Sequence, residues 1–124
     1  MEELKKEEYD DYIKFMYEFT KIEYKLKDIP TIPYIIVIKI DGKIIGTGSL
    51  HKIYKLHNHP VAQIEDVMIT EKYRGMGYGK KIIEHLVEVG KRDCYKVILN
   101  CLDKNIGFYE KCGFYRNGNE MRMN

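Results

Sequence analysis

The residues with the clearest chemical potential lie in the stretch YRGMGYGKK, residues 73–81. Glycine at every second position lets backbone N–H groups approach a ligand without interference from a Cβ atom. The apolar periodicity that starts near Lys80 predicts a helix directly afterwards, whose N-terminus adds unpaired N–H donors and a favourable dipole. Arg74, Lys80 and Lys81 add positive charge. The stretch therefore predicts an anion site, best suited to a phosphate or pyrophosphate.

Two familiar phosphate-binding patterns do not fit this stretch. A P-loop requires Ser or Thr after its lysine, but residue 81 is a second lysine. A dinucleotide fingerprint requires Gly-x-Gly-x-x-Gly, and the third glycine here comes one place early. The pattern that fits is Arg-x-x-Gly-x-Gly, formed by Arg74, Gly77 and Gly79. The alternative is a glycine-rich turn without a ligand, but the strand before it, the helix after it and the basic flanks favour a ligand.

Two adjacent carboxylates, Glu65 and Asp66, lie in a segment that is expected to be a strand. Neighbouring side chains of a strand point to opposite faces, which argues against a paired acid dyad. A salt bridge to a lysine is the alternative for either carboxylate. The triplet His57-Asn58-His59 lacks further metal ligands at a fixed spacing and is expected to be a loop.

The cysteines Cys94, Cys101 and Cys112 match no zinc pattern, and their odd number argues against a disulfide framework. We expect them to be small buried hydrophobic residues.

Length and composition indicate one globular domain over residues 1–124. The chain has 44% apolar and 32% charged residues, which is ordinary for a globular protein. A net charge of +2 is too small to indicate a nucleic-acid partner. No stretch is long enough to span a membrane, and the charged start MEELKKEEYDDY has no apolar signal core. These features predict a cytoplasmic protein with no membrane partner.

The order of expected elements predicts an α/β fold with a mixed sheet, because a hairpin feeds a strand–helix–strand crossover. The hairpin turn is Asp41-Gly42. The expected elements are a helical segment over 5–27 broken near Thr20, strands over 34–40, 43–50, 61–70 and 95–101, a helix from Lys80, a short helix over 104–112 closed by Gly113, and a tail over 114–123 forming a strand or hairpin.

Three blocks of the chain resemble a known family. IEDVMITEKYRGMGYGKKII, CYKVILNC and NIGFYEKCGF occur in this order between Gln63 and Phe114. They resemble the glucosamine-6-phosphate N-acetyltransferase branch of the GNAT acetyltransferase superfamily. The resemblance implies a twisted, mostly antiparallel sheet with splayed middle strands, acetyl-CoA as co-substrate, no metal, and a homodimer in which the partner completes each sugar site. The implied reaction is direct acetyl transfer to the amine of glucosamine 6-phosphate in a ternary complex.

The resemblance also assigns residues to the coenzyme. Main-chain groups of Val67, Met68 and Ile69, in the strand expected over 61–70, would hold the pantetheine arm. The glycine loop would hold the pyrophosphate. Tyr109 would protonate the leaving thiolate, whereas Phe108 is expected in the core. The implied coenzyme-binding residues are Val67, Met68, Ile69, Arg74, Gly75, Met76, Gly77, Tyr78, Gly79, Lys80, Asn100, Asn105 and Tyr109.

The acceptor side follows from the same resemblance. Carboxylates suit the hydroxyls and ammonium group of an amino sugar, and lysines suit its phosphate. The implied acceptor-binding residues are Thr20, Lys52, Ile53, Tyr54, Lys55, Glu65, Asp66, Val67, Tyr95, Lys96 and Asn124. For each lysine and tyrosine, an exposed surface position or a packing role is the alternative.

The chain departs from the family pattern at three places. Asn100 stands where an acidic residue is usual, and an amide has no useful proton affinity. Glu65, water or a backbone carbonyl would then receive the proton of the amine. The opening strand of the family and its arginine are expected to be missing, and Asn124 stands where a basic residue is usual. Two alternatives therefore stay open: transfer to another small amine, or a coenzyme A-binding module with weakened catalysis.

Overall fold

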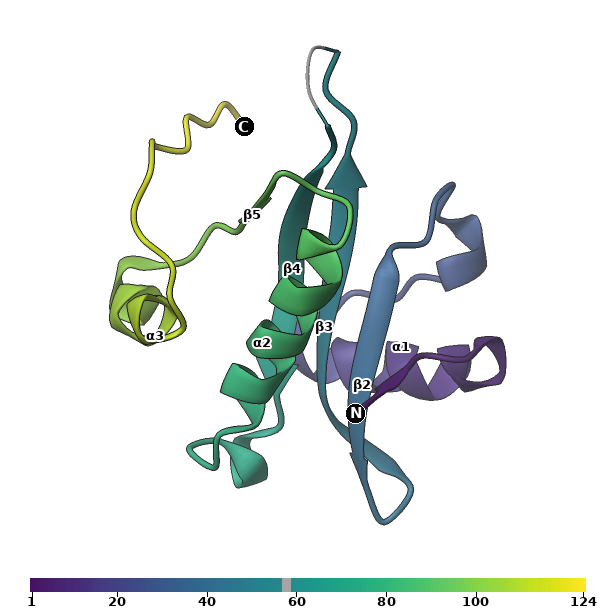
Figure 1. The fold of residues 1–124 in the computed structure, drawn as a ribbon. Coiled ribbons are helices and arrows are strands. Elements are labelled where there is room, and N and C mark those ends of the chain that lie inside the picture. Colours follow the sequence, from purple (N-terminus) through teal and green to yellow (C-terminus); the bar gives the residue numbers. More distant parts are fainter. Residues whose placement is uncertain (57–58) are drawn as a thin grey trace.

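A five-stranded sheet in the order β1-β2-β3-β4-β5 forms the centre of the molecule (Figure 1). The computed structural model describes residues 1–56 and 59–124. The triplet expected to be a loop, His57-Asn58-His59, thus lies largely outside the described residues. The strands are β1 (Glu2–Glu3), β2 (Tyr34–Ile40), β3 (Lys43–Ile53), β4 (Val61–Ile69) and β5 (Lys96–Ile98). The helices are α1 (Tyr9–Thr20), α2 (Tyr78–Lys91) and α3 (Ile106–Lys111), with short 3₁₀ turns at Lys6–Glu8, Leu26–Asp28, Glu71–Tyr73 and Asp103–Asn105.

All neighbouring strands pair antiparallel except β4 and β5, which pair parallel. The β2–β3 connection is the two-residue turn that the sequence predicts. Asp41 and Gly42 both have positive φ, 52° and 76°, as a type I′ hairpin requires. The predicted α/β fold with a mixed, mostly antiparallel sheet is confirmed.

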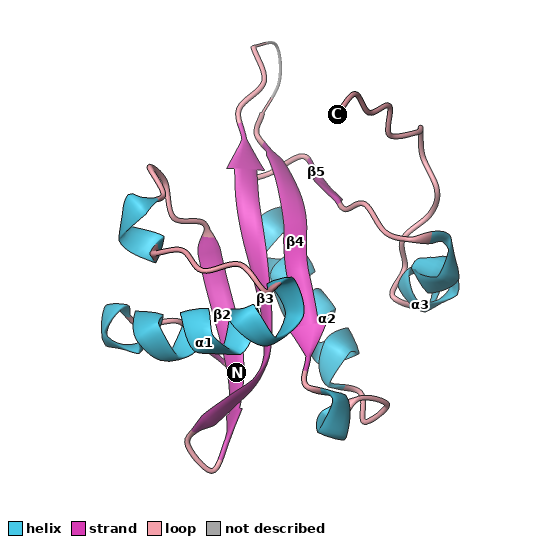
Figure 2. Ribbon diagram, turned by 180° about the vertical axis from the view of Figure 1, so that it is seen from behind, coloured by secondary structure: helices cyan, strands magenta, loops and turns pink. Residues whose placement is uncertain are grey.

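The two long helices cover opposite faces of the sheet, α2 in Figure 1 and α1 in the reverse view of Figure 2. The α2 face buries an aliphatic cluster that includes Ile36, Ile82 and Leu86. The α1 face buries a second cluster that includes Tyr12, Phe15 and Val37. Each helix is amphipathic, so each seals one face of β2–β4.

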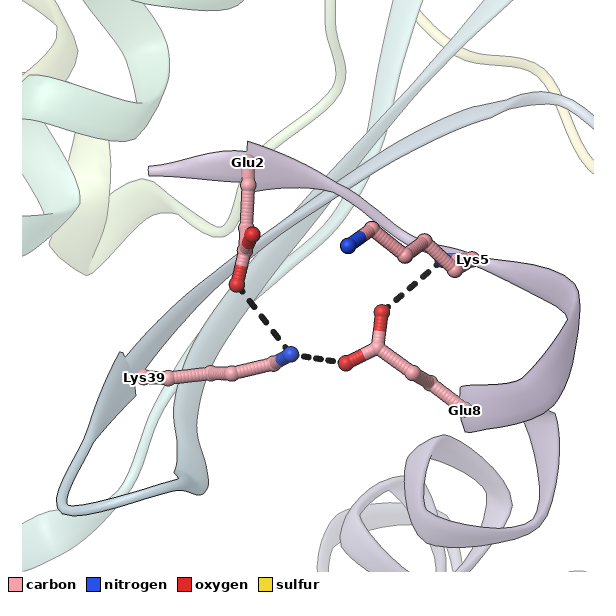
Figure 3. A network of polar contacts seen from close by, with 4 residues as sticks. All are labelled: Glu2, Lys5, Glu8 and Lys39. Atoms are coloured by element: carbon pink, nitrogen blue, oxygen red, sulfur yellow. Dashed lines mark hydrogen bonds and ion pairs between the residues drawn. The ribbon is translucent and has the colours of Figure 1, made fainter.

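The N-terminal segment corrects the expectation that the opening strand is missing. A two-residue strand, β1, pairs with β2. Figure 3 shows how ion pairs fasten it: Lys39 of β2 reaches both Glu2, at 3.1 Å, and Glu8. The backbone N–H of Lys5 donates to the carboxylate of Glu8 at 3.0 Å. These contacts hold the start of the chain against the edge of the sheet.

Several element boundaries differ from the prediction. The expected second helix before β2 is a single 3₁₀ turn over Leu26–Asp28. It is separated from α1 by Lys21, whose left-handed φ of 56° ends that helix. β3 extends through Ile53, three residues further than expected, whereas β5 is limited to three residues. The tail after Phe114 carries no strand among the described residues. Of the cysteines, only Cys94 is buried; Cys112 is half-buried and Cys101 is exposed.

None of the described helices is both long and apolar enough to cross a membrane.

Candidate active site

One edge of β4 is open over most of its length. β5 pairs with β4 only through Val61–Gln63, opposite Lys96–Ile98. Beyond Gln63, β5 diverges toward α3, as both ribbon views show. Residues 64–69 therefore present backbone N–H and C=O groups with no partner strand on that side, within the part of the chain that is described. An extended ligand can pair there as an added strand. The predicted splay of the middle strands is confirmed.

A β-bulge interrupts the pairing of β3 with β4 at the same place. The register passes from Thr47↔Met68 to Ser49↔Glu65, so β4 uses one more residue than β3. The extra residue is Asp66, whose φ is 53°. Bulges of this kind redirect side chains, and they occur often beside active sites.

The bulge corrects the prediction that Glu65 and Asp66 point to opposite faces. Ile64, Val67 and Ile69 all pack in the α2-side cluster, so the alternation of side chains is reset between positions 64 and 67. Both carboxylates therefore lie on the α1 face. Burial raises the pKa of Asp66, and the negative charge of Glu65 raises it further. The two carboxylates are therefore neighbours on one face, an arrangement that strand alternation excluded.

Other polar residues of β3 and β4 share this face with the carboxylates. Ser49 Oγ donates to the backbone oxygen of Glu65 at 3.0 Å. Gln63 Nε2 donates to Glu65 Oε1. His51 lies opposite Gln63 in the register. We call these five residues, Ser49, His51, Gln63, Glu65 and Asp66, the acceptor face, because their donors and carboxylates suit a hydroxylated cation.

Two tyrosines approach the acceptor face from the elements that cover it. Tyr12 of α1 is buried, its hydroxyl hydrogen-bonds the side chain of Thr47, and burial raises its pKa to about 12. Tyr24 is half-buried in the segment after α1, and burial followed by the nearby charge of Asp66 raises its pKa. Both phenols therefore remain neutral and can act as hydrogen-bond donors.

The glycine loop runs from the end of β4 to the start of α2. Gly75 and Gly77 have φ of 78° and 87°, and Gly77 is the residue directly before the helix. Arg74 Nε donates to the carbonyl oxygen of Ile69 at 2.9 Å, which ties the loop to the open end of β4. The first turn of α2 contains no acidic residue. The predicted anion site thus has the required backbone geometry: left-handed glycines followed by a free helix N-terminus.

The short helix α3 lies beside this helix N-terminus. A Cβ atom at Gly79 would be 3.5 Å from Phe108 Cζ, so the two helices meet closely. Phe108 is 40% exposed, which corrects its expected place in the core. Its ring contacts Tyr109 edge-on, with ring centroids 5.0 Å apart. α3 therefore places Tyr109 close to the glycine loop.

Tyr109 is half-buried, and its environment keeps the phenol protonated. Burial raises its pKa, and nearby Cys101 and Cys112 raise it further. Tyr109 and Asn100 line the same open groove, about 540 Å³ in volume, between α2, β5, α3 and the tail. Asn105 directly precedes α3. A neutral phenol is a proton donor, whereas the amide of Asn100 accepts no proton.

Most of the other predicted acceptor residues do not gather on the acceptor face. Lys52 alternates to the α2 side, where it forms an ion pair with Asp93. Thr20 Oγ1 donates to the carbonyl oxygen of Met16 at 3.2 Å and accepts from the backbone N–H of Ile22, so it caps the end of α1. The remaining members lie on exposed or half-exposed surface at the end of β3 and just after it, around β5 and in the tail: Ile53, Tyr54, Lys55, Tyr95, Lys96 and Asn124.

Sequence reasoning missed His51, Gln63 and Tyr24 as neighbours of the acid pair. A signal for the first two was present. Ile64, Val67 and Ile69 are apolar at spacings of three and then two residues, which indicates one inserted residue in the strand. No local pattern marks Tyr24, because only the packing of the segment after α1 brings it to Asp66.

Comparison with known proteins agrees with this geometry. The model of the acetyltransferase (GNAT) family matches residues 1–114. The chain belongs to this family. Among its members, glucosamine 6-phosphate N-acetyltransferase from Candida albicans is 37% identical over 109 residues, which cover 84% of this chain and 72% of the relative. The enzyme of the same name from Dictyostelium discoideum is 39% identical over 96 residues, which cover 73% of this chain but only 61% of the relative.

Similarity to solved structures extends over the whole chain. A crystal structure of an acetyltransferase from Trypanosoma brucei superposes with a TM-score of 0.88 at 29% identity, covering 99% of this chain and 96% of that one. The fold described above is therefore that of a solved acetyltransferase structure.

Proposed function

We propose that the protein transfers the acetyl group of acetyl-CoA to the amine of glucosamine 6-phosphate. The observation that carries the proposal is the continuity of three features along one side of the molecule. The open edge of β4 at residues 64–69 leads into the glycine loop, and α3, which carries Tyr109, packs against the residue Gly79 of that loop. The acceptor follows from the relatives that bear this enzyme name.

The coenzyme fits this path by simple chemistry. Main-chain groups of Val67, Met68 and Ile69 pair with the amides of the pantetheine arm. The pyrophosphate lies on the N–H groups of Gly75–Lys80, helped by the charges of Arg74 and Lys80. The thioester then lies where β4 and β5 separate, between the acceptor face and Tyr109.

The reaction is a direct transfer. The free amine attacks the thioester carbonyl carbon, a C–N bond forms, and the charge that develops on the carbonyl oxygen is stabilised by a main-chain N–H near Val67. The C–S bond then breaks, and the thiolate takes the proton of the Tyr109 phenol. Water returns a proton to the tyrosinate and removes the one that the acceptor-face carboxylates take from the amine, so both groups regain their starting states. The amine loses its proton to the carboxylates of the acceptor face, because Asn100 accepts none. Holding both reactants together supplies much of the rate.

The resemblance also supports a homodimer in which the partner completes the sugar site. The tail beyond α3 exposes apolar side chains consistent with such an interface: Met121 is 90% exposed and Met123 98%. Light scattering of the purified protein tests the proposed homodimer separately. A monomer with full activity would contradict the homodimer.

One observation favours the second candidate, a different small amine as acceptor. Of the lysines expected to hold the sugar phosphate, Lys52 is engaged with Asp93 on the opposite face of the sheet. A site that lacks concentrated positive charge would accept an unphosphorylated amino sugar as readily as a phosphorylated one.

A thiol-release assay decides between the candidates. The protein is incubated with acetyl-CoA and, in parallel, with glucosamine 6-phosphate, glucosamine and a panel of small amines. Preferred turnover of glucosamine 6-phosphate supports the proposal. Turnover only of other amines assigns a different acceptor, and binding of acetyl-CoA without turnover of any amine identifies a coenzyme-binding module.

A further inference from the structure

The acceptor face contains one residue that no role above uses, His51. It is half-buried in β3, opposite Gln63, and shares a face with Glu65 and Asp66 because the bulge turns both carboxylates toward it. Leu50, its neighbour in the strand, packs in the α2-side cluster, which fixes His51 on the other side. The imidazole therefore faces an acid pair inside the proposed site.

We propose that His51 is a positioning residue of the acceptor site, whose imidazolium keeps the carboxylate of Asp66 ionised beside Glu65. This inference rests on the proposed function, because it assigns the group through which the acceptor's ammonium is held and loses its proton. Two adjacent carboxylates that are partly withdrawn from water repel each other, and one of them would tend to take up a proton. A cation opposite them removes that tendency.

The other groups on this face cannot replace His51 in this role. Among the described residues, the titratable groups facing Asp66 are Glu65 of β4, Tyr12 of α1, Tyr24 of the segment after α1 and His51 of β3. Glu65 and the two phenols carry no positive charge in any protonation state, so His51 is the group among these four that can carry one. In agreement, His51 lowers the pKa of Asp66, against the effects of burial and Glu65.

The consequence for catalysis concerns the acidic side of the pH–rate profile. Asp66 must be ionised to receive the ammonium group and then its proton. An imidazolium holds Asp66 ionised at lower pH, so its removal raises the pKa of Asp66 and moves the loss of activity to higher pH. An opposite charge within about 4–6 Å of a carboxyl group lowers its pKa by about one unit or more.

The test compares two substitutions at the same position. In His51→Gln the charge is lost, and we expect the acidic limb of kcat/KM for glucosamine 6-phosphate to move up by about one pH unit. In His51→Lys a permanent charge replaces the imidazolium, and the limb should stay near its wild-type position. His85→Gln is the matched control, because His85 contacts Tyr34 on the α2 side of the sheet, with Nε2 2.9 Å from the hydroxyl.

A second measurement requires no turnover. The side-chain carboxyl ¹³C resonance of Asp66 should titrate at higher pH in His51→Gln than in wild type. If the glutamine variant does not fold, His51→Asn gives the same comparison, because it also removes the imidazole. Identical titrations of Asp66 in wild type and in His51→Gln overturn the inference. Absence of wild-type turnover overturns the proposed function instead, and the titrations still decide the role of His51.

Discussion

The coenzyme side and the acceptor side of the site are built in different ways. The coenzyme side uses one continuous stretch, from the open edge of β4 through the glycine loop to the first turn of α2, with only α3 added from elsewhere. The acceptor side is assembled from β3, β4, α1 and the segment after α1, and it depends on a single extra residue in a strand. The coenzyme side can therefore be recognised within a short stretch of sequence, whereas the residues of the acceptor side come together only when the chain folds.

This difference explains why variants on the two sides should fail differently. A coenzyme-side variant changes either the backbone that touches the ligand or the proton donor beside it. An acceptor-side variant changes charges that several elements hold together, so its effects should be smaller and should depend on pH or on the acceptor.

The largest effect is expected at Tyr109. Tyr109→Phe removes the phenolic proton and keeps the ring that packs against Phe108 and Phe114. We expect kcat to fall by about a hundredfold, with unchanged binding of acetyl-CoA. Because burial raises the pKa of Tyr109, the wild-type phenol keeps its proton at neutral pH. Steady-state kinetics and calorimetry measure the two quantities, with Tyr9→Phe as a remote control; a variant with wild-type kcat removes the role.

The glycine loop should give the next largest effect. Gly77→Val forces a β-branched residue into a φ of 87° and places side-chain atoms where the phosphates approach the backbone. We expect the Kd for acetyl-CoA to rise by about tenfold or more, since one misplaced set of N–H donors already costs more than 1 kcal/mol.

Gly42→Val is the control that distinguishes loss of ligand contact from the effect of backbone strain alone. Gly42 has a similar φ, 76°, and equally open surroundings, but it lies in the β2–β3 turn, away from the site. Its variant should lose stability in thermal unfolding while it binds acetyl-CoA normally. If both variants bind acetyl-CoA equally well, the glycine loop is a turn that does not bind the phosphates.

The predictions for Gly77 and Gly42 rest on features that the sequence alone predicts, for a physical reason. The turn at Asp41-Gly42, the loop glycines and the amphipathic α2 are local patterns, in which each residue type is required by its own φ or by its own helical face. The acid pair was misassigned because strand alternation is a local rule, and the bulge at Asp66 breaks it. His51 and Tyr24 reach the site through register and packing, which no window of the sequence contains.

Position 100, beside Tyr109, tests where the proton of the amine goes, with a smaller expected effect. The family pattern places an acidic residue there, and Asn100 lines the groove shared with Tyr109. Asn100→Asp adds a proton acceptor at nearly equal volume. We expect kcat to be equal or a few-fold higher, with an altered acidic limb, because the new carboxylate works only when ionised. A large loss of kcat in a variant with unchanged thermal unfolding would show that the amide itself is required.

The smallest effect is expected at Lys52. The sequence placed it among the residues that hold the sugar phosphate, but the structure turns it to the α2 side, in an exposed pair with Asp93. Lys52→Ala should therefore leave the ratio of kcat/KM for glucosamine 6-phosphate and glucosamine unchanged. Lys55→Ala and Lys96→Ala form the comparison, because both side chains are free of any ion pair found among the described residues. At least one of them should lower turnover of the phosphorylated sugar alone, since each charge-assisted hydrogen bond to a phosphate contributes about 1.5–3 kcal/mol. If the wild-type protein uses both sugars equally well, positive charge does not select the acceptor, and the acetyl transfer proposed here serves a different amine.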